Sequence, residues 1–324
     1  MPNKKEVQEK IKELSKKYSS TGQDLHSYLE GLLYADYLSY WDYIHLDTLL
    51  TLQTPKTDFP DENIFIIYHQ ITELYFKLII HELEQITNNG RDIRENGKDL
   101  GWRKKLTFTF FKHRMNRIIR YFDNLINSFD IMIEGMNRDE FTKFRMSLLP
   151  GSGFQSVQFR SIEIYSTPIE NLLIKKGKSD NTQSLQQIYW SKGATELKSG
   201  KKTYTLTQFQ KKYNDSLTTL ATNLKSKNIW LKFKNLTATK KEKEEIVTLL
   251  KQYDFYVNVK WKLAHFKSAV KHLKSKGIKK ATGGTNWEKY LPPRFQRIIF
   301  FPEIWTKKEK DEWGISWIKK QLNG

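Results

Sequence analysis

The stretch from Asp61 to Gln85, DENIFIIYHQITELYFKLIIHELEQ, constrains the fold more than any other part of the chain, because it is apolar on nearly every side. A helix that is apolar all round belongs inside a protein rather than on its surface. Pro60 and the acidic Asp61 suit the first turn of such a helix. His69 lies in its middle, one turn after Phe65. This histidine is either a core residue bonded to a backbone carbonyl or a functional imidazole, and the rest of the chain must separate the two interpretations.

The composition limits the classes of protein to which this chain can belong. The chain has 324 residues, enough for one large domain or two smaller ones. It has no cysteine, which excludes disulfides and thiolate metal sites and favours an intracellular compartment. The amino terminus lacks the apolar core of a signal peptide, and no apolar run is long enough to span a membrane. We therefore expect a soluble, cytoplasmic protein with no membrane partner.

The net charge of +19 raises the alternative of a nucleic-acid-binding helical protein, which would bind DNA or RNA in a salt-sensitive manner. The lysines, however, are spread through almost every segment and often alternate with glutamate, as in TKKEKEEIVTLL. This pattern is typical of a solvated surface rather than of a concentrated basic groove. We expect no nucleic-acid partner.

Two further long helices are expected from apolar residues that recur every three or four positions, one over about 102–133 and one over 239–274. Asn137 and Glu140 have the spacing of a capping box and predict a short helix that ends near Leu148. No βαβ alternation and no convincing two-residue strand pattern is present. The sequence therefore predicts an all-α fold, a multi-helix bundle with long buried helices.

The short helix carries Phe141 and Arg145 one turn apart on one face. A helical arginine usually extends its charged group to solvent. After this helix, Gly151, Ser152 and Gly153 either form a tight turn or let the backbone approach something flat.

His69 and His265 each lie in an apolar face of a long helix, and two such helices can hold a planar cofactor between them. Haem is the natural candidate, since a neutral imidazole is its commonest axial ligand in oxygen-handling proteins. Without cysteine the haem would be non-covalent. A non-haem iron site needs two histidines and a carboxylate, but His265 and His272 are two turns apart, too far to chelate one ion. No strand precedes Ser152 to make it a nucleophile elbow.

Four motifs, in this order and at these separations, carry a resemblance to the tryptophan 2,3-dioxygenase family: FIIYHQITELYFKLIIHELE, FRMSLLPGSGFQSVQFRSIE, WKLAHFKSAV and the ATGGT loop. The resemblance reaches from about residue 38 to 305 and is poor through 175–235. It implies a single haem-dioxygenase domain over 1–324, with an amino-terminal helical arm at 1–38 and a variable helical insertion at 175–235. It also implies an intertwined homotetramer, a dimer of dimers.

The resemblance further implies the chemistry: both atoms of O2 are inserted across the indole C2–C3 bond of L-tryptophan, giving N-formylkynurenine in the kynurenine pathway. His265 would be the proximal ligand of haem b, and His69 would accept a hydrogen bond from the indole N–H. Arg145 would bind the substrate carboxylate. The remaining implied roles are the indole pocket (Phe65, Phe141), the haem edge (Ser152, Gly153), closure over the ammonium and carboxylate groups (Thr282), and a contribution from the amino-terminal segment of a neighbouring subunit (Tyr40).

The sequence departs from the family pattern at several places. Tyr75 stands where tryptophan is common, and Ala281 stands where glycine is usual. The interval from His265 to the ATGGT loop is longer than expected, which leaves His272 as an alternative proximal ligand. His265 is favoured because Trp261 lies one turn before it, as in the family's W-x-x-x-H pattern. A haem monooxygenase acting on an indole or phenol amino acid is an alternative function, and a helical scaffold without a cofactor is another.

Overall fold

The computed structural model describes residues 3–35, 38–149, 151, 153–173, 188, 190, 202–274, 277–278, 287–293 and 297–314. The chain divides into two compact units, Met1–Thr54 and Pro55–Gly324. Helices dominate both units, and the one sheet in the described residues has two short strands, so the expected all-α class is confirmed. The expectation of a single domain whose arm ends at residue 38, with an insertion at 175–235, stays a prediction.

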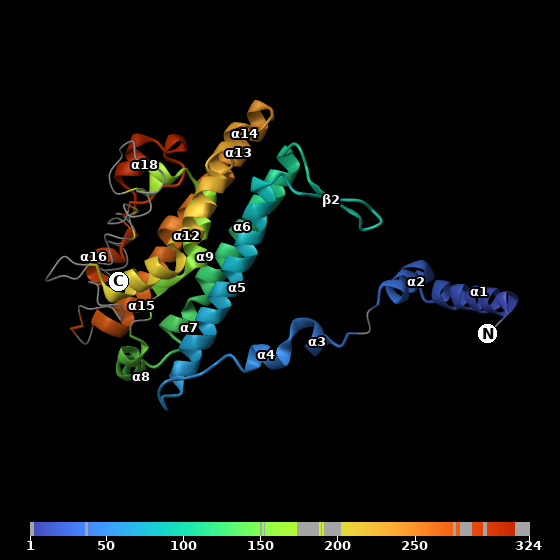
Figure 1. Ribbon diagram of the computed structural model, residues 1–324, viewed down its shortest axis with the longest axis horizontal. Helices are drawn as coiled ribbons and strands as arrows, with labels where there is room; N and C mark the ends of the chain where they lie inside the picture. The colour runs from blue at the N-terminus through green and yellow to red at the C-terminus, as the bar shows by residue number, and fades with distance from the viewer. Residues whose placement is uncertain are drawn as a thin grey trace. The chain divides into compact units, whose positions relative to one another are not determined.

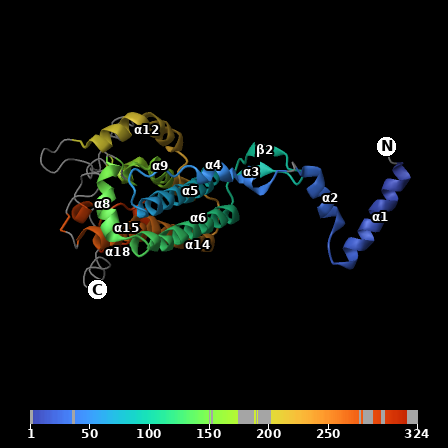
Figure 2. The ribbon, with the colours of Figure 1, turned by 90° about the horizontal axis from the view of Figure 1, so that it is seen from below.

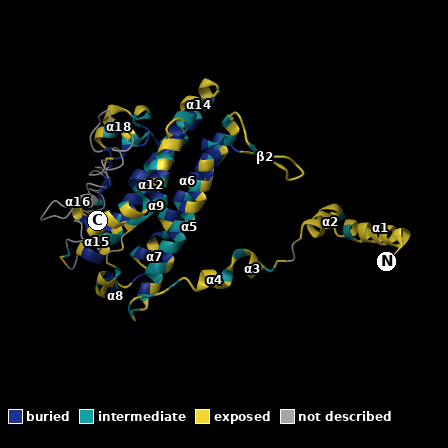
Figure 3. Ribbon diagram, viewed as in Figure 1, coloured by how far each residue is buried: buried dark blue, intermediate teal, exposed yellow. Residues whose placement is uncertain are grey.

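The amino-terminal unit has no buried residue in any of its helices. The rings of Tyr18 and Tyr28 pack against each other between the first two helices, 4.6 Å apart from centre to centre. Most of its large apolar side chains are exposed, as the yellow ribbon of this unit in Figure 3 shows. The helices of this unit are α1 (Lys4–Ser20), α2 (Leu25–Tyr34), α3 (Tyr40–Ile44) and α4 (Leu46–Leu50).

The second unit is a bundle of long helices (Figure 1). Its first half consists of α5 (Asp61–Thr87), β1 (Arg91–Ile93), β2 (Asp99–Trp102), α6 (Phe108–Ser128), α7 (Asp130–Ile133), α8 (Arg138–Phe144), η1 (Arg145–Leu148), η2 (Gly153–Gln155), α9 (Val157–Ser166) and η3 (Ile169–Leu172). Its second half consists of α12 (Tyr204–Leu224), α13 (Ile229–Lys234), α14 (Lys240–Phe255), η5 (Tyr256–Lys260), α15 (Trp261–Leu273), α16 (Trp287–Tyr290), η7 (Pro302–Ile304) and α18 (Lys307–Asp311).

The long helices lie side by side in the order α14, α6, α5, α9 and α12 (Figures 1 and 2). The buried carboxylate of Glu82 on α5 joins two of them. It accepts a hydrogen bond from Arg114 Nη1 at 2.7 Å and lies 3.1 Å from Arg117 Nε, both on α6. The facing sides of these helices form the main core, drawn dark blue in Figure 3. The central stretch expected to be buried is therefore a helix of the bundle interior.

The structure corrects two features of the expected long helices. The second long helix begins at Phe108 rather than near residue 102, because the preceding residues form the β1–β2 hairpin. Gly90 opens this hairpin at φ +86°, and a Cβ there would come within 2.5 Å of the Phe110 ring. The third long helix runs almost as expected, from Lys240 to Leu273, but the π-helical turn η5 interrupts it just before Trp261.

Asp254, at the end of α14, holds the carboxyl-terminal segment against the bundle. Its buried carboxylate accepts from the backbone N–H groups of Phe300 and Phe301 at 3.0 and 3.2 Å. It also accepts from Trp305 Nε1 at 3.0 Å and from Asn258 Nδ2, in the π turn, at 2.8 Å. One side chain thus connects α14, η5 and the segment around η7.

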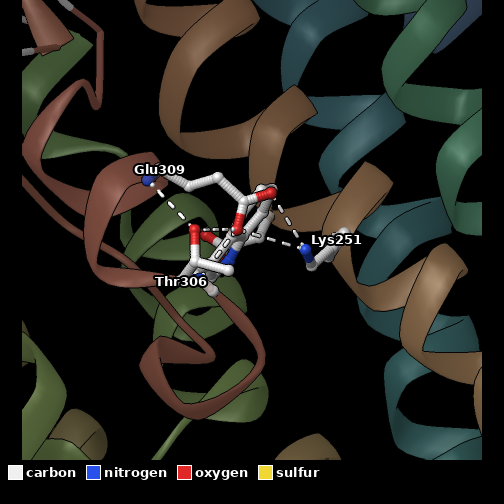
Figure 4. A network of polar contacts seen from close by, with 5 residues as sticks. Lys251, Thr306 and Glu309 are labelled. Carbon is white, nitrogen blue, oxygen red and sulfur yellow. Dashed lines mark hydrogen bonds and ion pairs between the residues drawn. The ribbon is translucent and has the colours of Figure 1, made fainter.

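A second contact fixes the same segment from outside (Figure 4). Thr306 and Glu309 form a capping box at the start of α18. Lys251 of α14 places its Nζ 3.0 Å from Glu309 Oε1 and 4.7 Å above the Trp305 ring. Within the part of the chain that the structure describes, no helix is both long and apolar enough to cross a membrane.

Candidate active site

His69 lies in the middle of α5, and its ring is oriented by the preceding turn of the same helix. Its Nδ1 lies 2.7 Å from the carbonyl oxygen of Phe65. Because a carbonyl can only accept, Nδ1 carries the proton and Nε2 keeps its lone pair. The Phe65 ring packs 4.1 Å from the imidazole. Burial lowers the pKa of His69, although the Phe65 carbonyl and Glu73 raise it, so the ring is neutral at neutral pH.

His265 on α15 has the same local geometry. Its Nδ1 lies 3.0 Å from the carbonyl oxygen of Trp261, so Nδ1 is again the donor. Burial lowers the pKa of His265 to about 4, against the opposing effect of the Trp261 carbonyl. The Trp261 ring meets the imidazole edge-on at 4.3 Å. The result is a neutral imidazole whose Nε2 lone pair can bind a metal.

The two imidazoles belong to one region of the bundle. Phe129 packs 4.6 Å from the ring of His265 and 5.4 Å from that of Tyr68, the neighbour of His69. Both α5 and α15 pack against α7 and α8. Sequence reasoning missed Phe129 as a site residue, because its spacing is that of an ordinary core position.

His272 has a different environment. It is 1% exposed, and its Nε2 lies 2.7 Å from the carbonyl oxygen of Met132. Nε2 is therefore the protonated nitrogen. Nδ1 is buried with no hydrogen-bond partner in the described residues. The Phe141 ring packs 5.1 Å away. This geometry is that of a core histidine bonded to a backbone carbonyl.

Arg145 follows α8 directly and is the first residue of η1. Its side chain is 6% exposed, and burial lowers its pKa from the ordinary arginine value. Phe141, one turn earlier, lies 6.2 Å from Phe65 and 5.6 Å from Phe144, ring centre to ring centre. The structure therefore brings the helix of Phe141 and Arg145 against the helix of Phe65 and His69. A buried guanidinium one turn after an aromatic residue of this cluster can receive a carboxylate attached to an aromatic group.

The expected capping box at Asn137 is only half correct. Asn137 does cap α8, since its side chain accepts from the N–H groups of Asp139 and Glu140. The Glu140 side chain, however, does not accept the backbone N–H of Asn137, as a capping box requires. Its Oε2 accepts the N–H of Asp61 at 3.2 Å, and the Asp61 carboxylate accepts the N–H of Asn137 in turn. The amino termini of α5 and α8 thus cap each other.

The other expected residues are placed less fully. Ser152 and Thr282 lie outside the described residues. Gly153 begins η2, and a Cβ added there would meet no atom of the described residues within 4 Å. Tyr40 is 70% exposed at the start of α3, in the amino-terminal unit. No three His, Asp or Glu side chains converge as a metal site among the residues that the structure describes.

Comparisons with known proteins agree with these motifs. A family model described as tryptophan 2,3-dioxygenase matches residues 30–252. A tryptophan 2,3-dioxygenase of Ruegeria sp. (strain TM1040) is 29% identical over 277 residues, covering 84% of this chain and 92% of the relative. One from Bacillus thuringiensis subsp. konkukian (strain 97-27) is 28% identical over 287 residues, covering 84% and 92%. One from Herpetosiphon aurantiacus is 39% identical over 128 residues, covering 39% and 44%.

Proposed function

The chain belongs to the tryptophan 2,3-dioxygenase family and is therefore an oxidoreductase, and on this premise we propose that it converts L-tryptophan and O2 into N-formylkynurenine. Both oxygen atoms enter the product, across the indole C2–C3 bond. The observation that carries the proposal is the pair of neutral imidazoles, His69 and His265, each with Nδ1 bonded to a backbone carbonyl and Nε2 left as a lone pair.

Haem b is the proposed cofactor, and the residues fit it. His265 supplies a neutral nitrogen ligand from a buried helix, which is what a His-ligated haem needs. Ser152 and Gly153 are assigned to the haem edge by resemblance. When bound, the haem activates O2 for reaction with the indole.

His265 rather than His272 is the proposed proximal ligand. The Nε2 of His272 donates to the Met132 carbonyl, and the side chain is enclosed by the core. Breaking that hydrogen bond would leave a buried carbonyl without its donor, which costs free energy. His265 can bind iron through Nε2 and keep its bond to Trp261.

The substrate is held by its two ends. Arg145 binds the carboxylate with charge-assisted hydrogen bonds, and Phe65 and Phe141 enclose the indole. Nε2 of His69 accepts a hydrogen bond from the indole N–H, which orients the ring while leaving the proton on the substrate nitrogen. By resemblance, Thr282 closes over the ammonium and carboxylate groups. Tyr40 comes from a neighbouring subunit of a homotetramer, and the enzyme is cytoplasmic.

The mass of the product tests the reaction. Haem-supplemented protein is incubated with tryptophan under O2, and the product is expected to gain two oxygen atoms. A gain of one oxygen would favour the haem monooxygenase instead. A preparation without a Soret absorption band, with salt-sensitive binding to DNA or RNA, would favour the nucleic-acid-binding protein.

The ligand is tested by replacing each histidine. His265→Ala should abolish the Soret band of the haem-supplemented protein, because the iron loses its protein ligand. His69→Ala should keep the band and weaken turnover, since His69 contacts the substrate and not the iron. Replacement of the exposed His81, on the same helix, is the control. If the band survives in His265→Ala and disappears in His272→Ala, the assignment is reversed.

A further inference from the structure

The junction between α5 and α8 consists of two hydrogen bonds that cross between the helices. Glu140 Oε2 accepts the N–H of Asp61 at 3.2 Å, and the Asp61 carboxylate accepts the N–H of Asn137. The residues are 79 and 76 positions apart in the chain. Each carboxylate thereby satisfies a helix-terminal N–H that has no partner within its own helix.

The same two carboxylates offset the charge of the two helix ends. The amino terminus of a helix carries a partial positive charge, so two such ends placed together repel each other. Asp61 is the first residue of α5 and Glu140 lies in the first turn of α8, and both side chains are partly buried. A third contact lies beside them, where Lys143 Nζ sits 5.5 Å above the ring of Phe59.

The substrate-binding groups follow this junction within one or two helical turns. Phe65 and His69 come four and eight residues after Asp61, and Arg145 comes five residues after Glu140. The spacing between the indole-binding groups on α5 and the guanidinium after α8 therefore depends on how the two amino termini are held together. α8 has only seven residues and packs against both α5 and α15, and the two hydrogen bonds of the junction hold its amino terminus.

We propose that Asp61 and Glu140 are positioning residues that set the distance between the indole pocket and Arg145, so that one amino acid can be bound at both its ring and its carboxylate. The inference rests on the proposed function. A shift of Arg145 by about 1 Å is enough to impair a charge-assisted hydrogen bond, whereas the indole pocket on α5 would be little changed. Loss of the junction should therefore weaken the binding of ligands that carry a carboxylate and leave the binding of other ligands nearly unchanged.

The test compares two ligands on the haem-containing full chain. Dissociation constants are measured from the change in the Soret band for tryptophan and for 3-methylindole, which has the ring but no carboxylate. Asp61→Ala should raise the dissociation constant of tryptophan about tenfold and that of 3-methylindole less than twofold. Asp61→Asn keeps one acceptor oxygen and should lie nearer the wild type. Asp58→Ala is the matched control, because Asp58 is exposed, three residues earlier, and makes no hydrogen bond in the described residues.

Glu140→Ala is the second variant and should show the same selectivity if Asp61→Ala does not fold. The double variant should raise the dissociation constant of tryptophan little more than Asp61→Ala does, since both side chains form one junction. An equal rise in the dissociation constants of both ligands, or no change in either constant, would overturn the proposal. A wild-type protein that binds 3-methylindole but not tryptophan, or neither, would instead contradict the proposed function.

Discussion

Arg145 is the residue at which substrate selection should be decided. It is a buried cation one turn after Phe141, whose ring packs against that of Phe65. A planar guanidinium can hold a carboxylate with two parallel hydrogen bonds, which a lysine cannot reproduce.

Arg145→Met should therefore raise KM for tryptophan strongly, by a free energy on the order of 2–5 kcal/mol, with haem binding intact. Arg145→Lys keeps the charge but loses the two-pronged geometry and should recover only part of the affinity. The measurement is steady-state kinetics together with the Soret spectrum, and the exposed Arg120→Ala is the control. An unchanged KM in Arg145→Met would place the carboxylate elsewhere.

At the scale of elements, the π turn η5 and the carboxyl-terminal segment depend on one buried carboxylate. Burial raises the pKa of Asp254 to about 6, although its four N–H donors lower it. An unfolded aspartate titrates near ~3.9. Between about pH 4 and pH 6 the folded protein therefore keeps a proton that the unfolded chain has lost. The contribution of Asp254 to the free energy of unfolding is fully present below this window and is lost as the pH rises through it.

Asp254→Asn should destabilise the protein, because an amide nitrogen cannot accept from the donors that one carboxylate oxygen serves. Each buried donor left unsatisfied costs about 1–3 kcal/mol. The deficit relative to wild type should be larger near pH 4.5 than near pH 7, since only the wild type gains stability on protonation. Urea unfolding at both pH values measures it, with the exposed Asp311→Asn as control. A deficit that grows with pH would contradict the assignment.

The helices were predicted with uneven success. The long apolar stretch from Asp61 was found within two residues of its end at Thr87, because its pattern continues over many turns. The β1–β2 hairpin was missed, since strands of three and four residues show too little alternation to be recognised. The π turn was missed too, because a single turn of five residues is too short for its spacing to be told from that of the helix around it.

At the scale of the whole molecule, the amino-terminal unit exposes many large apolar side chains, including Leu32 and Leu33 of α2 at 60% and 76%. Exposed large apolar side chains in this number are typical of an association site. This agrees with the proposed homotetramer, in which the arm contacts a neighbouring subunit.

Leu33→Lys should shift the assembly toward smaller species, because a charge would have to be buried in the interface. Light scattering after size-exclusion chromatography measures the mass, with a tetramer expected for the wild type. Glu9→Lys adds positive charge at an exposed position of α1 and serves as control. A monomeric wild type would remove the basis for assigning Tyr40 to a neighbour's site.

The sequence by itself determined the helical class, the buried central helix, and the residue types that gather at the site, because helical periodicity and apolar burial are local properties of the chain. It also placed His69 and Arg145 on apolar faces. Only the tertiary structure shows that the Nε2 of His272 donates to a carbonyl 140 residues away, whereas the Nε2 of His265 has no hydrogen-bond partner among the described residues. Only the tertiary structure shows that Glu140 accepts the N–H of Asp61 rather than that of Asn137. Hydrogen-bond partners depend on proximity in space, which the spacing of residues along the chain does not encode.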